Sequence, residues 1–447
     1  MTYSPTDSRL FGPLFSDPKI GAEFRDEQFV RYLLEVEAAL ARVQGTQAII
    51  PAAAAEQIAE RAPTLALDWD RLQAATERAG FPIIELVAQI RKAVGAEAAE
   101  YVHWGATTQD IMDTALILQL RNVLVVLGEQ LDAVITQLAT LAEEHRHTLM
   151  AGRTHAQQAL PITFGLKVAG WLAPLLRHRQ RLAELRPRLL VVQFGGAAGT
   201  LAALGTDGIA VQQALAAELG LGCAPMPWHT QRDHLVEFAG WLSLVTGSLA
   251  KMAQDIILLA QSEVAEVNES DDRSRGGSST MPQKSNPIVS ELIIAAARTN
   301  ASLLSSLHNA QIHEHERATH GWQMEWLALP QMIGLTGAAL AKARFLSENL
   351  VVEATQMARN VAASNGLMLA EAVSFVLAEQ MPRAEAKVLV TKAVAIALAE
   401  ERHLVDVVQA QVDLPVDWAA VRDEHNYLGA TQQFIDQVLT EVRTMNG

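Results

Sequence analysis

"LILQLRNVLVVLGEQLDAVITQLATL", residues 116–141, carries the pattern that decides the fold. Its leucines and valines recur every three or four residues, which places them on one face of an α-helix over more than three heptads. Other apolar residues, such as Leu118 and Val126, lie outside this face. We therefore expect a long helix that is buried on more than one side.

The same spacing is repeated elsewhere in the chain. It recurs over residues 235–259, and two further long helices are predicted over 162–185 and 288–310. Pro161 suits a first helical position, and Asn286 with Pro287 suits an N-cap and first turn. Helices that are apolar on several sides belong inside a bundle, which subunits can share.

Evidence for β-structure is thin. Residues 189–194 form only a short apolar run, and no Asn-Gly or Asp-Gly hairpin signal occurs. The predicted fold class is therefore all-α. Prolines and a glycine break the first part into shorter helices at Pro51, Pro63, Gly80 and Pro82.

Helix lengths divide the chain into three regions, which the family resemblance given below implies are domains. We expect an N-terminal helical domain over 1–106, a central long-helix domain over 107–350 and a C-terminal helical domain over 351–447.

Composition limits the class of protein. The 447 residues are 50% hydrophobic and 19% charged, as in a soluble globular protein, and we see no apolar run of the roughly 18 residues that a membrane span needs. The N-terminus shows neither a signal nor a transit peptide pattern, so a cytoplasmic location is expected.

A net charge of -15 argues against nucleic-acid binding, and an anionic ligand would need local positive charge. The single cysteine, Cys223, excludes an intrachain disulfide and is expected to be a buried small apolar residue rather than a nucleophile.

The first polar segment is "HWGATTQDIMDT", residues 103–114. Thr107, Thr108 and Gln109 could hydrogen-bond a carboxylate at a helix N-terminus, where backbone N–H groups also favour anions. The alternative is that Thr108 or Asp110 only caps the helix.

The second is "GRTHAQQALP", residues 152–161. His155 lies in a segment bounded by glycine and proline, beside Thr154. Its ordinary pKa near neutrality makes it an acid or base candidate, and the alternative is a hydrogen-bonded structural histidine.

The third is "DDRSRGGSSTMPQKSNPIVSELII", residues 271–294. Consecutive glycines allow unusual backbone conformations, and the segment also offers hydroxyls, an ammonium and an amide. Such a loop could close over a small anionic substrate and exclude water. The alternative is a disordered linker, against which stand two prolines and the apolar Met281.

Two further segments fail as cofactor motifs. "HERATH", residues 315–320, has the wrong spacing for two zinc-binding histidines on one helix face, and "FGGAAG", residues 194–199, lacks the glycine spacing and lysine of nucleotide-binding loops. No metal and no other cofactor is predicted.

The three polar segments together resemble the fumarase/aspartase superfamily. "GGSSTMPQKSNP" is similar to its signature loop, and the segments at 103–110 and 152–161 are similar to its two other shared motifs, in the expected order. The resemblance implies a three-domain, all-helical subunit in a homotetramer. It also implies active sites assembled from three subunits, with one motif from each.

The resemblance further implies roles for the matching residues. Ser278 would be the general base at a carbon next to a carboxylate, helped by loop N–H groups and Lys284. His155 would lie near the leaving or attacking group, with Glu291 as its charge partner. Substrate contacts are expected from the following residues: Thr107, Thr108, Gln109, Thr154, Ser279, Met281, Asn286, Arg317, Trp322 and Trp326.

Two branches of the superfamily are nearest in pattern. The adenylosuccinate lyase branch would be expected to carry a serine and an arginine at Trp322 and Trp326, and two indoles cannot replace a phosphate clamp. "FPIIELV", residues 81–87, also lacks that branch's His-Asp pair. "GWQMEW" and "PIIELV" are instead similar to the lactonizing cycloisomerase branch, which adds a substrate carboxylate across a conjugated double bond.

The residues fit an unsaturated polycarboxylate. Lys284, Arg317 and the two threonines could bind its carboxylates, while Trp322 or Trp326 could form a flat apolar wall; ordinary interface packing is the alternative for these tryptophans. Two alternatives for function stay open: another, fumarate-releasing lyase of the superfamily, and a structural protein on the same scaffold. Retention of the four residues with predicted chemical roles counts against the second, because bundle stability needs none of them: Ser278, His155, Lys284 and Glu291.

Overall fold

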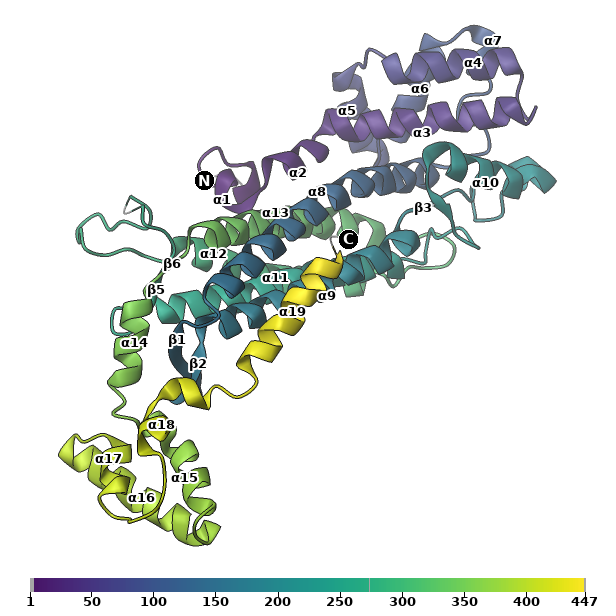
Figure 1. Cartoon of the computed structure of the whole chain (residues 1–447). Helices are drawn as coiled ribbons and strands as arrows, with labels where there is room; N and C mark the ends of the chain where they lie inside the picture. Colours follow the sequence, from purple (N-terminus) through teal and green to yellow (C-terminus); the bar gives the residue numbers. More distant parts are fainter. Residues whose placement is uncertain (1–3, 273, 446–447) are drawn as a thin grey trace. The chain divides into compact units, whose positions relative to one another are not determined.

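Long helices dominate the middle of the chain in the computed structural model, which describes residues 4–272 and 274–445 (Figure 1). They are α8 (Thr108–Glu144), α9 (Phe164–Leu189), α11 (Asp233–Leu259), α12 (Ile288–Ala310) and α13 (Gly321–Asn349).

The periodic leucines and valines form the buried side of these helices, as predicted. In α8, Leu120, Val123 and Leu127 are fully buried. Leu118, which lies off the seam, is also fully buried, so α8 is covered on more than one side. The prediction of an all-α fold is confirmed.

Shorter helices occupy both ends of the chain, again as predicted. Gly80 ends α5 in the left-handed conformation with φ +85°, and α4 and α6 begin after Pro51 and Pro82. The α-helices on the N-terminal side are α1 (Gly12–Phe15), α2 (Pro18–Glu23), α3 (Asp26–Thr46), α4 (Ala52–Arg61), α5 (Trp69–Ala79), α6 (Ile83–Ala93), α7 (Ala96–Ala99) and, between the long helices, α10 (Gly208–Leu219). Those on the C-terminal side are α14 (Ala354–Ala362), α15 (Ala370–Ala378), α16 (Arg383–Glu400), α17 (Leu404–Gln409), α18 (Trp418–Arg422) and α19 (Thr431–Met445).

Short strands pair in three two-stranded sheets within the described residues. The antiparallel pairs are β1 (Leu149–Thr154) with β2 (Gln157–Thr163), and β5 (Val267–Asn268) with β6 (Val351–Val352). The parallel pair is β3 (Val191–Val192) with β4 (Gly222–Cys223). The β1–β2 hairpin was not predicted, because its turn has no Asn-Gly or Asp-Gly signal.

The prediction that Pro161 opens the third long helix is wrong. Pro161 lies in β2 and pairs with Ala151. The helix α9 begins later, at Phe164, where the hydroxyl of Thr163 accepts a hydrogen bond from Leu166 N at 3.2 Å. In a two-stranded ribbon both strands are edges, so a residue without an N–H group is tolerated there.

The prediction that Cys223 is buried is also wrong. Cys223 is exposed, and its thiol donates to the side-chain oxygen of Gln212 at 3.4 Å. It lies in β4, a two-residue strand in which both residues are exposed.

The chain divides into two compact units. Unit 1 comprises 1–130, 178–246 and 295–339, and unit 2 comprises 131–177, 247–294 and 340–447. Unit 1 has an apolar core that includes Leu33, Leu40 and Phe194, and unit 2 has one around Leu369, Val373 and Leu404, where α15, α16 and α17 pack together (Figure 1). The division into three domains at 106/107 and 350/351 stays a prediction.

Helices α8, α11 and α12 are long and apolar enough to cross a membrane by length and composition alone. The expectation that no apolar stretch reaches that length therefore needs correction, because scattered charges do not lower the mean hydropathy of these windows enough. In α8, 72% of the apolar window is buried inside the protein, whereas in α12 the share is 28%. Much of α12 thus presents apolar surface that this single chain does not cover.

Candidate active site

The residues predicted to form the site fall into both units. Unit 1 contains Thr107, Thr108, Gln109, Arg317, Trp322 and Trp326. Unit 2 contains Thr154, His155, Ser278, Ser279, Met281, Lys284, Asn286 and Glu291.

A buried carboxylate organises the first motif. Asp110, 1% exposed, accepts hydrogen bonds from the backbone N–H groups of Thr107, Gly195 and Gly196, at 2.9–3.0 Å. Its Oδ1 also accepts from Nε2 of His229 at 2.7 Å. We call these contacts the Asp110 clip. They bring the glycine-rich segment that follows β3 against the beginning of α8.

Glycine is required at one position of that segment. Gly196 has φ +68°, and a Cβ there would lie 3.2 Å from the carbonyl oxygen of Gly105. The "FGGAAG" segment, which has no nucleotide-binding spacing, thus serves to approach the first motif closely.

Arg317 also joins these two segments. It contacts carbonyl oxygens of the glycine-rich segment and the hydroxyl of Thr107 in the first motif. Its guanidinium donates to Thr107 Oγ1 at 3.2 Å, to the carbonyl oxygen of Ala197 at 2.8 Å and to that of Gly196 at 3.3 Å. The structure therefore brings two predicted site residues, Thr107 and Arg317, into direct contact.

Behind the first motif lies a buried group of charges, which we call the Arg232 cluster: Asp113, Arg232 and Glu325. Arg232 is 1% exposed and makes paired hydrogen bonds to Asp113 at 2.6 and 3.0 Å, and to Glu325 at 2.5 and 2.8 Å. Gln109 is also buried, and its amide nitrogen donates to Asp113 and to the carbonyl oxygen of His229, both at 3.0 Å. Arg232, the residue before α11, thus links α8 and α13 within unit 1 as a forked arginine between two carboxylates.

The cluster shifts the acidity of its neighbours. Burial, and then the charge of Arg232, lower the pKa of His234 to about 4. Burial and Arg232 also lower the pKa of His313. Burial raises the pKa of Glu325, and Arg232 opposes that rise. His234 and His313 are therefore neutral near pH 7.

The two tryptophans of α13 have different surroundings. Trp322 is 7% exposed, and its indole N–H donates to Asp113 at 3.0 Å. Trp326 is 36% exposed and meets Trp322 edge-on at 4.8 Å between ring centroids. Trp326 borders a cavity of about 390 Å³ whose other lining residues include Phe81, Pro82 and Met112. Trp322 borders the same cavity, but Trp326 is the more exposed of the two indoles.

The second motif forms the tip of the β1–β2 hairpin. His155 and Ala156 are the two turn residues between the paired Thr154 and Gln157. Both have positive φ, 49° and 62°, as a two-residue hairpin turn of the primed type requires. Since neither is glycine or asparagine, the turn holds an exposed His155 side chain at some cost in backbone strain.

A buried ion pair supports this hairpin. Arg153 in β1 makes paired hydrogen bonds to Glu266 at 2.7 and 2.8 Å, and Glu266 is fully buried. The amide of Asn360 donates to the same carboxylate at 2.8 Å. The hairpin is thus anchored at Arg153, two residues before the turn, while His155 remains accessible.

The third motif is a loop closed only at its base, which we call the signature loop, residues 276–286. The N–H and the side-chain amide of Asn286 both donate to the carbonyl oxygen of Gly276 at 2.8 Å, and Gly277 bridges to Ser285. A Cβ at Gly276 would lie 2.1 Å from the carbonyl oxygen of Asn286, so this position needs glycine. The predicted linker alternative therefore does not describe this segment.

The side chains that carry the predicted chemistry stand on this loop. The hydroxyl of Ser278 accepts from the N–H groups of Thr280 and Met281 at 3.3 and 3.1 Å. Ser279, Met281 and Lys284 are exposed, as is Glu291 in the first turn of α12. N–H donors directed at the Ser278 oxygen would stabilise its anionic form.

The prediction that Asn286 caps α12 is wrong. Its side chain closes the loop base instead, and Glu269 takes the capping role. The Glu269 carboxylate accepts from Val289 N at 3.0 Å and Ser290 N at 2.7 Å. A carboxylate from a preceding segment satisfies the first N–H groups of the helix as well as a local cap does.

Sequence reasoning missed several residues that build the site. Gly195, Gly196, His229, Arg232 and Glu325 are brought together from three separate segments of unit 1. The unusual double glycine at 195–196 was the only local signal. The ion pairs join residues 119 and 93 positions apart, which no local pattern reveals.

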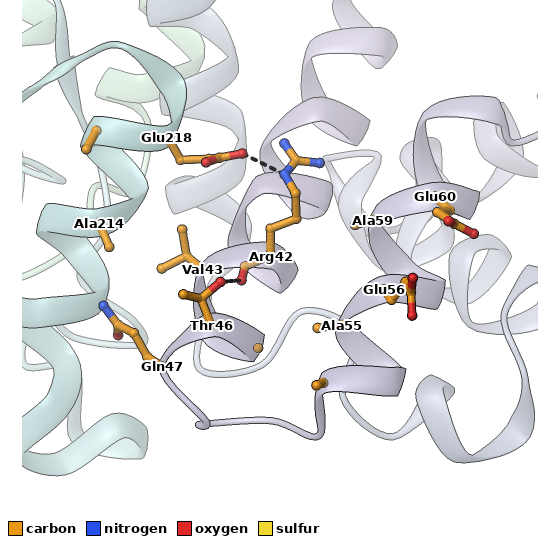
Figure 2. A pocket seen from close by; sticks show the side chains of 13 residues that line it. Arg42, Val43, Thr46, Gln47, Ala55, Glu56, Ala59, Glu60, Ala214 and Glu218 are labelled. Carbon is orange, nitrogen blue, oxygen red and sulfur yellow. Dashed lines mark hydrogen bonds and ion pairs between the residues drawn. The ribbon is translucent and has the colours of Figure 1, made fainter.

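A larger groove of about 930 Å³ lies elsewhere in unit 1, between α3, α4 and α10 (Figure 2). None of the predicted site residues lines it. Its basic side chain, Arg42, is paired with Glu218 at 2.6 Å, and Glu56 and Glu60 add negative charge. The groove is therefore poorly suited to a polycarboxylate.

The class of protein follows from three features: a predominantly helical fold, a loop that bears hydroxyls and a lysine, and two further polar motifs. Residues 17–299 match the model of the lyase family, and the chain belongs to that family. The predicted membership of the fumarase/aspartase superfamily is confirmed.

Individual relatives cover the whole chain. A 3-carboxy-cis,cis-muconate cycloisomerase from Pseudomonas aeruginosa is 44% identical over 442 residues, which are 97% of this chain and 96% of the relative. The crystal structure of the 3-carboxy-cis,cis-muconate lactonizing enzyme from Pseudomonas putida superposes with a TM-score of 0.93 at 41% identity, covering 98% of this chain and all of that chain. A fumarate lyase from Mesorhizobium sp. BNC1 superposes with a TM-score of 0.90, also at 41% identity, over 95% of this chain and 98% of that chain. The first two names agree with the predicted lactonizing cycloisomerase branch.

Proposed function

We propose that the protein is a 3-carboxy-cis,cis-muconate cycloisomerase. It would close 4-carboxymuconolactone by adding a substrate carboxylate to a conjugated double bond in protocatechuate breakdown, the β-ketoadipate pathway. The observation that carries the proposal is full-length similarity to relatives of that name, in a chain whose three polar motifs are intact.

The proposed reaction needs little from the protein except charge and one proton. A carboxylate oxygen of the substrate forms a bond to an alkene carbon, and the π electrons move toward a neighbouring carboxylate as an enolate. A proton then reaches the adjacent carbon. The Ser278 hydroxyl donates this proton and regains one from solvent, and Lys284 with the loop N–H groups neutralises the enolate charge. Since the nucleophile belongs to the substrate, His155 orients it, with Glu291 as its charge partner.

The remaining predicted residues bind substrate or support those that do. Thr107 and Thr108 offer donors to carboxylates at the beginning of α8, where backbone N–H groups also favour anions. Trp326 forms an apolar wall that packs against Trp322, and both the Trp322 indole and the Gln109 amide donate to Asp113. The other proposed contacts come from Thr154, Ser279, Met281 and Asn286.

The proposal also includes a cytoplasmic homotetramer whose sites combine motifs from three subunits, and the three-domain division. Apolar side chains support the assembly, because Leu258 of α11 and Ile288 of α12 are 46% and 38% exposed in the single chain. Two buried carboxylates in α8, Asp110 and Asp113, favour packing in protein rather than in lipid.

A second candidate is a fumarate-releasing lyase. The superposed fumarate lyase is as similar in sequence as the lactonizing enzyme, at 41% identity. Both reactions make or break a bond next to a carboxylate, so the site geometry serves either.

Ultraviolet absorbance separates the candidates. We expect purified protein to remove the diene absorbance of 3-carboxy-cis,cis-muconate, and Ser278→Ala to lower kcat by about 10²–10⁴-fold. The Ser278→Ala variant should keep the wild-type oligomeric state, because among the described residues the hydrogen bonds of this hydroxyl lie within its own loop. Fumarate release from substituted succinates with no loss of muconate would overturn the cycloisomerase proposal. Near-normal turnover by Ser278→Ala would remove this residue from its role.

A further inference from the structure

We propose that Arg317 is a positioning residue that acts on the substrate through Thr107. Its guanidinium would hold the Thr107 hydroxyl with the proton turned outward, as a donor to a substrate carboxylate. This inference rests on the proposed function, since it assigns a carboxylate to the first motif.

The direction of one hydrogen bond carries the argument. Arg317 Nη1 lies 3.2 Å from Thr107 Oγ1. A guanidinium has N–H donors and no acceptor, so the hydroxyl oxygen must accept in this contact. The single hydroxyl proton of Thr107 is then left to donate to another group. A carboxylate at the beginning of α8 is a suitable acceptor.

The other contacts of Arg317 fix its position without any ligand. Nη2 donates to the carbonyl oxygens of Gly196 and Ala197, at 3.3 and 2.8 Å. Three of the five guanidinium N–H groups therefore serve protein oxygens. An arginine engaged in this way is better placed to orient Thr107 than to clamp a carboxylate in both prongs.

The Asp110 clip holds the same glycine-rich segment through its N–H groups. Asp110 accepts from the N–H groups of Thr107, Gly195 and Gly196, while Arg317 donates to the carbonyl oxygens of Gly196 and Ala197. Two opposite charges thus hold the glycine-rich segment, and Asp110 also holds the backbone of Thr107. Only the rotation of the threonine hydroxyl remains to be set, and Arg317 sets it.

A double-mutant cycle tests this assignment. Thr107→Val removes the hydroxyl at nearly constant volume and should lower kcat/KM about 10–100-fold, as expected for a lost hydrogen bond to a charged group. The loss should fall mainly in KM, because the contact exists in both the ground and transition states. Arg317→Met should cause a loss of similar size in the wild-type background. In the Thr107→Val background it should cost less than about threefold, since its target is gone.

Three further variants complete the cycle. Thr107→Ser keeps a hydroxyl and should restore most of the KM and the sensitivity to Arg317→Met. Arg317→Lys repeats the cycle in case Arg317→Met folds poorly. Arg121→Met is the matched control, because Arg121 also donates from unit 1 to a carbonyl, that of Leu219 at 2.7 Å, and it should leave KM unchanged.

Losses that multiply in the double variant would overturn the proposal, because Arg317 would then bind substrate independently of Thr107. An unchanged KM in both Arg317→Met and Arg317→Lys would also overturn it. Failure of the proposed function is seen separately, as wild-type protein that consumes no muconate. The same cycle would then be measured on fumarate release from a substituted succinate, whose carboxylate needs the same donor.

Discussion

The Arg232 cluster in unit 1 and the signature loop in unit 2 hold their polar groups in opposite ways. Arg232 and its two carboxylates have side chains that are at most 4% exposed, and each carboxylate makes paired contacts with the guanidinium. Ser278 and Lys284 instead stand on a loop fixed at Gly276 and Asn286, with most side chains in solvent.

This difference teaches which polar groups carry structure and which carry chemistry. Buried charges must be paired, so removing one partner is costly even when no substrate is present. Groups on an exposed loop have little to lose in stability and are able to move onto a substrate. We therefore expect substitutions in the cluster to reduce folding stability, and substitutions in the loop to reduce turnover.

The sharpest test of the comparison is to remove the central charge. Arg232→Met leaves Asp113 and Glu325 buried without their partner, and should lower the free energy of unfolding by about 3–5 kcal/mol. Denaturant unfolding of purified protein measures this. The control is Arg42→Met, at the exposed pair with Glu218, which should cost about 1 kcal/mol or less. Equal losses in the two variants would mean that burial of the cluster does not matter.

A second test uses pH. Burial and Arg232 lower the pKa of His234 to about 4 in the folded chain, whereas an unfolded histidine titrates near 6.5. The stability that depends on neutral His234 is fully present above about pH 6.5 and is lost as pH falls toward 4. The loss should reach about 3 kcal/mol.

His234→Phe isolates this contribution. Phenylalanine keeps the edge-on contact with Trp228, where the ring centroids lie 4.5 Å apart, but does not titrate. The variant should lose less stability than the wild type between pH 6.5 and 4, as measured by denaturant unfolding at each pH. The exposed His320 is the control, and His320→Phe should keep the wild-type dependence. An unchanged slope in His234→Phe would assign the acid sensitivity to other groups.

A substitution at the base of the signature loop should have the smallest effect on stability. It should reduce turnover instead. Gly276→Ala forces a Cβ to within 2.1 Å of the Asn286 carbonyl oxygen at φ +66°, at a backbone cost of about 1–2 kcal/mol. Because the loop base must shift, kcat/KM should fall at least about tenfold, while the free energy of unfolding falls by no more than about 2 kcal/mol. Gly277→Ala is the matched control, since its nearest neighbour, the carbonyl oxygen of Ser274, would lie 3.8 Å away. Similar turnover in both variants would show that closure at Gly276 is dispensable.

Local patterns and long-range contacts contributed differently to what could be predicted. The periodic leucines of α8 and α11 identified buried helices, and the three motifs identified the superfamily. The hairpin at His155 was missed, because its turn uses residues that rarely adopt positive φ. The cap of α12 was assigned to Asn286, because a local cap is the simplest assumption, and Glu269 lies 20 residues before the helix N–H that it binds.

The sequence by itself determined the helices, because a period of 3.6 residues fixes which side chains share a face regardless of what covers them. It also determined the chemical inventory of the three motifs. Only the tertiary structure decided which polar groups meet. Asp113, Arg232 and Glu325 come from three separate segments, and so do Thr107, Gly196 and Arg317. Such pairs depend on how helices far apart in sequence pack, and nothing in the residues next to them records the partner.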